Sequence, residues 1–262
     1  MYLIIILIII LIIIYYNFNK VEKFSDNIIF LNKDELINII INNNKYYDTF
    51  NNLDLQVRNV KSIDEYKKLI INSPVTINSN EENLIKLSIN KMKNILKNYK
   101  SIGFDGIKAN NIELSIGIID GKLYEEGFPH TINNVIIIPK YTIYNNNYLI
   151  NILVHELVHI YQKKYPEDIK IYLDHNNFKI IPKLNINNRA NPDIDNNIYM
   201  DNNIMMCKYN DNPKSIMDII CYPTNNSKYE HPFELMAYNI ENDIQTIFYK
   251  GKHAGPPLII VL

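Results

Sequence analysis

Hydrophobic residues are spread unevenly along the chain, and their spacing predicts most of its regular elements. Residues 1–16 form one unbroken hydrophobic run, and the first charged side chain is Lys20. Further along, apolar residues recur at the spacing of an amphipathic helix, between capping residues and prolines that mark helix ends. Helices are expected at 33–45, from Ser62 to just before Pro74, at 80–100, at 147–164 and from near Pro232 to about Tyr249.

Two β-type runs lie between these helices. They cover 112–119 and 132–138 and are bounded by Asp120-Gly121 and Pro139. Residues 174–230 are rich in Asn, Asp and Pro and are expected to form loops with short strands. The order of helices, strands and two further helices predicts an α+β domain. We divide it into a helical N-terminal part at 20–110 and a core at 111–262.

The N-terminal hydrophobic run is long enough to cross a membrane as a helix. About 18 helical residues cover roughly 27 Å, close to the thickness of a thin hydrocarbon core. A cleaved signal peptide would have a basic start and a cleavage site of small residues, and neither is present. We therefore expect an uncleaved single-pass anchor at 1–19 and a protein localised at a membrane, with the side of the membrane left open.

Charge and composition exclude several classes of function. The 262 residues include 27 basic and 28 acidic side chains, so no basic excess exists to bind nucleic acid, and we expect none as a partner. A hydrophobic share of 47% excludes a disordered chain. Cys207 and Cys221 could form one disulfide or stay reduced.

One motif in the predicted helix at 147–164 carries chemistry. His155-Glu156-Leu157-Val158-His159 is an H-E-x-x-H sequence. Residues four apart lie on the same helical face, so both imidazoles can bind one ion. Zinc binds His nitrogen readily, and a catalytic zinc site keeps one position for water. Glu156 is placed to take a proton from that water, so we expect Zn2+ at His155 and His159 with Glu156 as general base.

With this motif the chain resembles the zincin metallopeptidases over roughly residues 110–245. The resemblance implies a small twisted sheet above the H-E-x-x-H helix and an edge strand that binds a peptide substrate. Metzincins continue with Gly and His where this chain has Gln162 and Tyr165, which excludes that branch. Gluzincins supply a Glu from a later helix, and Glu234 with Ala237 looks like their E-x-x-A pattern, so Glu234 is the expected third ligand.

For other residues near this site, the sequence leaves more than one role possible. Alternative third ligands are Glu241, His231 and His175, and the candidates to orient a ligating histidine are Asn239, Glu241 and Asp243. Candidates to stabilise the oxyanion are His130, Tyr238 and Tyr199. By analogy with zincins, 132–138 would be the edge strand that adds an extended peptide as a further strand.

Arginine is rare in this chain, and Arg189 lies in an acidic segment. We expect Arg189 to pair with Asp193 or Asp195 and so to order the loop. A calcium site formed by Asp193, Asp195 and Asp201 is the weaker interpretation, because the spacing is not that of a known calcium loop.

Together these features predict a membrane-anchored, zinc-dependent metallopeptidase of gluzincin-like type that acts on peptides or proteins. Two alternatives stay open. One is a different zinc hydrolase on the same scaffold, and the other is a catalytically inactive zincin scaffold that serves as a membrane-anchored structural or interaction protein.

Overall fold

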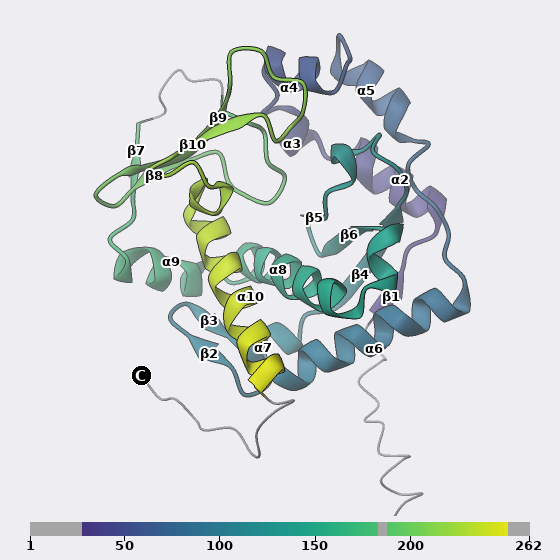
Figure 1. Cartoon of the computed structure of the whole chain (residues 1–262), viewed down its shortest axis with the longest axis vertical. Helices are drawn as coiled ribbons and strands as arrows, with labels where there is room; N and C mark the ends of the chain where they lie inside the picture. The colour runs from purple at the N-terminus through teal and green to yellow at the C-terminus, as the bar shows by residue number, and fades with distance from the viewer. Residues whose placement is uncertain (1–27, 183–187, 251–262) are drawn as a thin grey trace, which may run out of the picture.

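The computed structural model describes residues 28–182 and 188–250 and places a mixed four-stranded sheet at its centre (Figure 1). The strands are β1 (Ile28–Phe30), β4 (Leu114–Ile119), β6 (Val135–Pro139) and β5 (His130–Ile132), in that spatial order. β1 and β6 both run parallel to β4, whereas β5 and β6 form an antiparallel hairpin. Asn133 turns this hairpin with φ 54°, a conformation that asparagine tolerates better than most residues.

Helices cover both faces of this first sheet. Alternate residues of β6 point to opposite faces, so Val135 and Ile137 belong to one core and Ile136 and Ile138 to another. The first core is covered by α2 (Lys33–Ile41), α3 (Asn44–Tyr47), α4 (Asn52–Val57) and α5 (Ile63–Ile70). The second is covered by α6 (Ser79–Leu96), α8 (Asn146–Lys164) and α10 (Pro232–Lys250).

A second, antiparallel sheet is built from the Asn-rich part of the chain. Its strands are β7 (Lys179–Ile181), β8 (Ile198–Met200), β9 (Ile204–Tyr209) and β10 (Ile219–Tyr222). Cys207 and Cys221 lie opposite each other on β9 and β10 and form a disulfide. The shorter elements are the hairpin β2 (Lys100–Ser101) and β3 (Phe104–Asp105), α7 (Gly106–Asn110), α9 (Pro166–His175), and the 3-10 helices η2 (Glu125–Gly127), η3 (Lys140–Tyr144) and η4 (Ser227–Tyr229).

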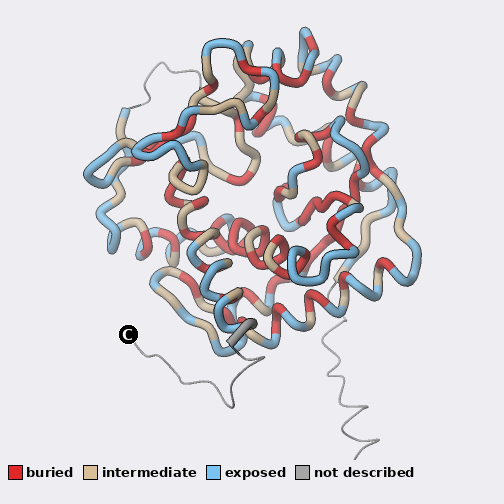
Figure 2. Tube along the Cα trace, in the orientation of Figure 1, coloured by how far each residue is buried: buried red, intermediate tan, exposed pale blue. Residues whose placement is uncertain are grey.

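The helix α8 is central to the structure, and most of its length is buried (Figure 2). The Asn145 side chain caps its first turn by accepting from the Tyr148 backbone N–H. The chain leaves the helix at Tyr165, and Pro166 then begins α9. α10 crosses α8 in Figure 1, and apolar residues of both helices belong to the same core. This crossing brings the H-E-x-x-H motif next to the first turn of α10.

The predicted fold class is wrong. The chain is a mixed α/β protein with two four-stranded sheets and a two-stranded hairpin among its described residues, not an α+β zincin-like domain with a single small sheet after a transmembrane helix. Within 28–182 and 188–250, no helix combines the length and the apolar character needed to cross a membrane. The anchor predicted at 1–19 lies outside the described residues, and no described helix could take its place. The prediction of a membrane-localised protein was wrong.

Two predicted elements also differ in detail. The run 132–138 is not one edge strand, because the chain turns at Asn133 and β6 pairs with a neighbour on each side. The edge strand next to β6 is β5. Beyond the helix predicted at 147–164, the chain forms a separate helix, α9, with Glu167 in its first turn.

Candidate metal centre

Three side chains from two crossing helices meet beside α8. His155 and His159 lie one turn apart on α8, and Glu234 lies in the first turn of α10. One potential ligand atom from each of the three lies within 4.8 Å of the others. The Glu234 Oε2 atom is 3.3 Å from His155 Nε2 and 3.7 Å from His159 Nε2. The structure therefore brings together the two motif histidines and the expected third ligand.

The hydrogen-bond partner of His159 decides which of its ring nitrogens carries a hydrogen. Its Nδ1 atom lies 2.9 Å from Gln162 Oε1, and an amide oxygen only accepts, so Nδ1 carries the hydrogen. Gln162 is itself oriented because its Nε2 donates to the Phe233 carbonyl oxygen at 2.9 Å. In the neutral ring, His159 Nε2 then keeps a lone pair, and this buried atom has no hydrogen-bond partner among the described residues. Gln162, noted in the sequence only for excluding metzincins, orients this histidine.

His155 is oriented by a carboxylate. Its Nδ1 atom donates to Glu241 Oε2 at 3.1 Å, which directs Nε2 toward Glu234. Burial lowers the pKa of His155, but hydrogen bonds from its ring to Glu234 and Glu241 outweigh burial and raise that pKa well above its ordinary value. Of the three candidates to orient a histidine, Glu241 is the one in contact. Asp243 accepts from the Tyr99 hydroxyl, and Asn239 is exposed.

Glu234 is held on its other side by a loop. Asn191 Nδ2 donates to Glu234 Oε1 at 2.8 Å and also reaches Glu230 Oε2 at 3.2 Å. Glu230 in turn forms a buried ion pair with Arg189. Burial raises the pKa of Glu234, but the nearby His159 and His155 outweigh burial and hold it well below its usual range, so Glu234 is a carboxylate.

Glu156 is buried beside this cluster and is available for proton transfer. It is 4% exposed, and its Oε2 atom has no hydrogen-bond partner among the described residues. Burial and the negative charge of Asp193 raise the pKa of Glu156 well above its ordinary value. A carboxyl beside the expected metal ligands is placed to take a proton from a bound water and to return it.

A cavity of about 290 Å³ opens beside these residues. Its wall includes His155, Glu156, Glu234, His130 and Tyr238. The Tyr238 ring packs edge-on against His155 at 4.6 Å between ring centroids. Burial and the negative charge of Glu234 raise the pKa of Tyr238 to about 12, so its hydroxyl keeps its proton at neutral pH.

His130 lines the same cavity, but its ring is oriented by the backbone. Nδ1 lies 3.0 Å from the Phe128 carbonyl oxygen and must carry the hydrogen. The buried Nε2 atom has no described partner and is an acceptor in the neutral ring. His130 and Tyr238 therefore both stay candidates on the cavity wall.

The remaining candidates lie in other contacts. His231 uses both ring nitrogens, with Nε2 at 3.1 Å from Asp195 and Nδ1 accepting from the Phe233 N–H. Tyr199 donates to Asp195, and His175 is exposed at the end of α9. These contacts place all three outside the metal cluster.

The loop around Arg189 also differs from prediction. Arg189 pairs with Glu230 and not with Asp193 or Asp195. The three aspartates of the calcium interpretation have separate partners: Asp193 contacts Thr131, Asp195 contacts His231, and Asp201 accepts from the Asn203 N–H. These contacts do not indicate a shared calcium site.

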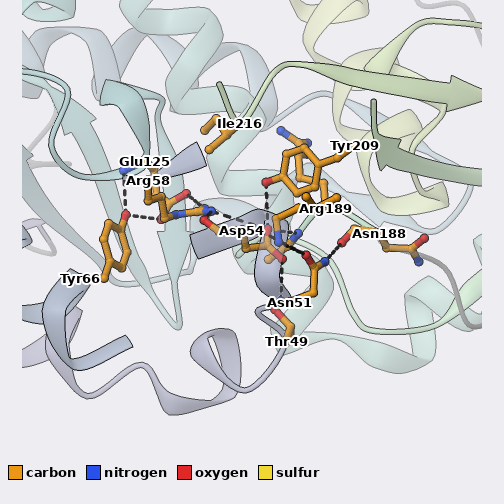
Figure 3. A network of polar contacts seen from close by, with 12 residues as sticks. Thr49, Asn51, Asp54, Arg58, Tyr66, Glu125, Asn188, Arg189, Tyr209 and Ile216 are labelled. Atoms are coloured by element: carbon orange, nitrogen blue, oxygen red, sulfur yellow. Dashed lines mark hydrogen bonds and ion pairs between the residues drawn. The ribbon is translucent and has the colours of Figure 1, made fainter. Parts of the chain in front are cut away.

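A buried polar network anchors this loop (Figure 3). The carboxylate of Asp54 accepts from the Ala190 N–H at 3.0 Å and from the Tyr209 hydroxyl at 2.9 Å. Asn51 Nδ2 donates to the Asn188 carbonyl oxygen at 2.8 Å. The loop that bears Arg189 and Asn191 is thus fixed to α4, far away in the sequence. Of the residues in this network, the sequence had pointed only to Arg189, because the others belong to no recognisable motif.

The donor set fits a transition-metal ion of the zinc type. Two imidazoles and one carboxylate match a catalytic zinc site, and both imidazoles donate their Nδ1 hydrogen to an oxygen, as ligating histidines commonly do. The unpartnered lone pair of His159 Nε2 is the observation that best fits a metal, because a buried polar atom without a partner is unfavourable.

Comparisons of the chain with protein-family models, with curated proteins and with solved structures give no match. The zincin resemblance therefore stays a prediction that rests on the residues of the site.

Proposed function

We propose that this chain is a zinc-dependent metallopeptidase with a gluzincin-like ligand set. His155, His159 and Glu234 would hold the zinc, and Glu156 would act as general base. The observation that carries the proposal is the buried, unpartnered Nε2 atom of His159 beside the Glu234 carboxylate.

The chain's own groups have distinct tasks in this reaction. When bound, zinc makes water more acidic and polarises a carbonyl oxygen. Glu156 takes the proton of the attacking water and passes it to the leaving nitrogen, which its place on the cavity wall allows. The protonated Tyr238 hydroxyl is our candidate donor to the developing oxyanion, because its ring packs against His155 on the cavity wall.

The test combines metal content with hydrolysis by the purified full-length chain. We expect about one zinc per chain and cleavage of short unstructured peptides. Glu156→Gln should keep the zinc and lower the hydrolysis rate by about a hundredfold or more, the usual effect of losing a general base. Glu167→Gln is the matched control, because Glu167 is exposed on α9.

Two outcomes would overturn the proposal. Equal hydrolysis by Glu156→Gln and the unmodified protein would remove Glu156 from the reaction. Zinc binding without cleavage of any peptide would favour the alternatives, a different zinc hydrolase or a non-catalytic scaffold.

A further inference from the structure

The edge strand β5 is the place where an extended peptide could join the first sheet. β5 pairs with β6 through Ile132 opposite Val135 and His130 opposite Ile137, with Thr131 between them. Alternate residues of an antiparallel strand direct their backbone groups to opposite sides. The N–H and C=O of Thr131 point away from β6, and an added strand would need both groups.

Both backbone groups of Thr131 are already occupied by side chains of the same chain. Asp193 Oδ1 accepts from the Thr131 N–H at 2.7 Å and from its hydroxyl at 2.6 Å. Lys163 Nζ donates to the Thr131 carbonyl oxygen at 3.3 Å and to its hydroxyl at 2.6 Å. The Asp193 carboxylate and the Lys163 ammonium group therefore block the free edge of β5.

The Asp193 side of this closure is buried and held in place. Thr131 is 0% exposed and Asp193 is 7% exposed. The Asp193 N–H donates to Asn191 Oδ1 at 2.9 Å, in the same loop that contacts Glu234. A peptide strand would have to displace Asp193 and leave its buried carboxylate without donors, which is strongly unfavourable.

The cavity offers another approach to the metal cluster. It lies along the first half of α8 and along α10, and its volume of about 290 Å³ is near the lower end for ligand sites, which span about 300–1,000 Å³. Three cavity-lining apolar side chains are half-exposed: Phe128, Tyr148 and Met217. They would contact an apolar side chain of a substrate that enters here.

We infer that the site takes short peptides with an apolar side chain, which enter through this cavity, and that Asp193 and Lys163 exclude extended strands by closing β5. This inference rests on the proposed peptidase function and specifies its substrate class.

The first experiment compares two peptides that share one cleavable apolar sequence. One has about four residues, and the other has about twelve and spans about 40 Å when extended. We expect kcat/KM for the short peptide to exceed that for the long one by about tenfold or more, since strand pairing adds nothing and displacement of Asp193 is unfavourable. A long peptide that is cleaved as well as the short one would overturn this inference alone. Cleavage of neither peptide would overturn the peptidase function itself, and this inference with it.

Binding provides a readout that does not depend on hydrolysis. The same peptides, each with a fluorescent label, are titrated into zinc-loaded Glu156→Gln protein, and their anisotropy is measured. The short peptide should again bind about tenfold more tightly than the long one. Equal or tighter binding of the long peptide would contradict the closure of β5.

A matched pair of variants then tests the cause of the selectivity. Asp193→Ala frees the Thr131 N–H, whereas Asp193→Asn keeps an oxygen that can accept from it. We expect the long-to-short ratio of kcat/KM to rise about tenfold in Asp193→Ala and to change much less in Asp193→Asn. An unchanged ratio in Asp193→Ala would overturn the role of this residue.

Discussion

Asn191 is the residue that connects the loop to the metal cluster. Its amide nitrogen donates to Glu234 and Glu230, and its amide oxygen accepts from the Asp193 N–H. With Glu234 Oε1 held in this way, Oε2 is the oxygen that faces His155. Groups that orient metal ligands commonly contribute a large part of the affinity of a site.

We therefore predict that Asn191→Ala weakens zinc binding by about tenfold to a hundredfold. Competition with a chelator of known zinc affinity measures this change without any substrate. Asn94→Ala on the exposed side of α6 is the control, and its affinity should equal that of the unmodified protein. Equal affinities for Asn191→Ala and Asn94→Ala would show that Glu234 needs no support from this loop.

A second residue-scale feature is the buried ion pair of Arg58 and Glu125 in the network of Figure 3. Arg58 Nη2 lies 2.5 Å from Glu125 Oε2, and Glu125 also accepts from the hydroxyls of Tyr46 and Tyr66. Burial raises the pKa of Glu125, but the Arg58 charge outweighs burial and lowers it below its ordinary value. A carboxyl with a lowered folded-state pKa stabilises the fold above its unfolded-state pKa, and this contribution is lost as the pH falls through the folded-state value.

Glu125→Gln should reduce the free energy of unfolding by about 3–5 kcal/mol at pH 7, because buried Arg58 would lose its nearer carboxylate and keep only Asp54 at 3.6 Å. The difference from the unmodified protein should shrink as the pH falls below about 4, where an unfolded glutamate becomes protonated. Urea unfolding at several pH values measures both effects. The exposed pair of Glu82 and Lys86 is the control, since Glu82→Gln should change stability by less than about 1 kcal/mol. A pH-independent difference for Glu125→Gln would contradict the assigned ion pair.

At the scale of elements, the sequence predicted best where local signals are strong. α6, α8 and α10 follow from helical periodicity, and α10 also from Pro232 at its start. Ser62 caps α5 as its pattern suggested. The H-E-x-x-H spacing was informative for the same reason, since a helix fixes the relative direction of residues four apart.

Elements set by distant contacts were not predictable in this way. β1 exists because it pairs with β4, and β5 separates from β6 through a two-residue turn inside an apolar run. α9 begins at a proline that we took only as the end of the preceding helix. Asn191 and Glu125 carry no local signal at all, because their roles come from partners far away in the sequence.

Gly106 begins α7 and lies against the backbone at the end of α6. A Cβ atom at Gly106 would lie 1.8 Å from the Leu96 carbonyl oxygen, a backbone atom at the end of α6. Gly106→Ala should therefore destabilise the fold by about 3 kcal/mol, the upper end for overpacking. Gly117→Ala is a useful comparison, because there the nearest atom is a flexible side-chain carbon of Leu36 at 2.6 Å, and we expect a smaller loss. Thermal unfolding of both variants measures the difference, and an equal or larger loss in Gly117→Ala would contradict the close packing at Gly106.

At the scale of the whole molecule, the metal cluster connects parts of the fold that are remote along the chain. α8 packs against the first sheet, α10 packs across α8, and the loop that supports Glu234 is tied to α4. The fold class was not predictable from element order, because parallel pairing of β1, β4 and β6 depends on which strands meet in space. In the candidate site, His155, Glu156 and His159 were predictable from their spacing on one helix, and Glu234 on α10 from its resemblance to the gluzincin pattern.

Because the three expected ligands come from two helices, a bound zinc ion should stabilise the whole fold. A ligand that binds only the folded state at about a hundredfold above its Kd adds about 2.7 kcal/mol. For a chain of this size, that corresponds to a rise in Tm of about 5–10 °C. Removal of zinc with a chelator should lower Tm by this amount, and readdition of zinc should restore it.

In His159→Ala the chelator should have little effect, whereas His175→Ala, which alters only an exposed histidine, should respond like the unmodified protein. This measurement is independent of catalysis, so it tests the metal centre even if the substrate is not a peptide. An equal chelator response in His159→Ala and His175→Ala would place the stabilising metal away from the crossing of α8 and α10.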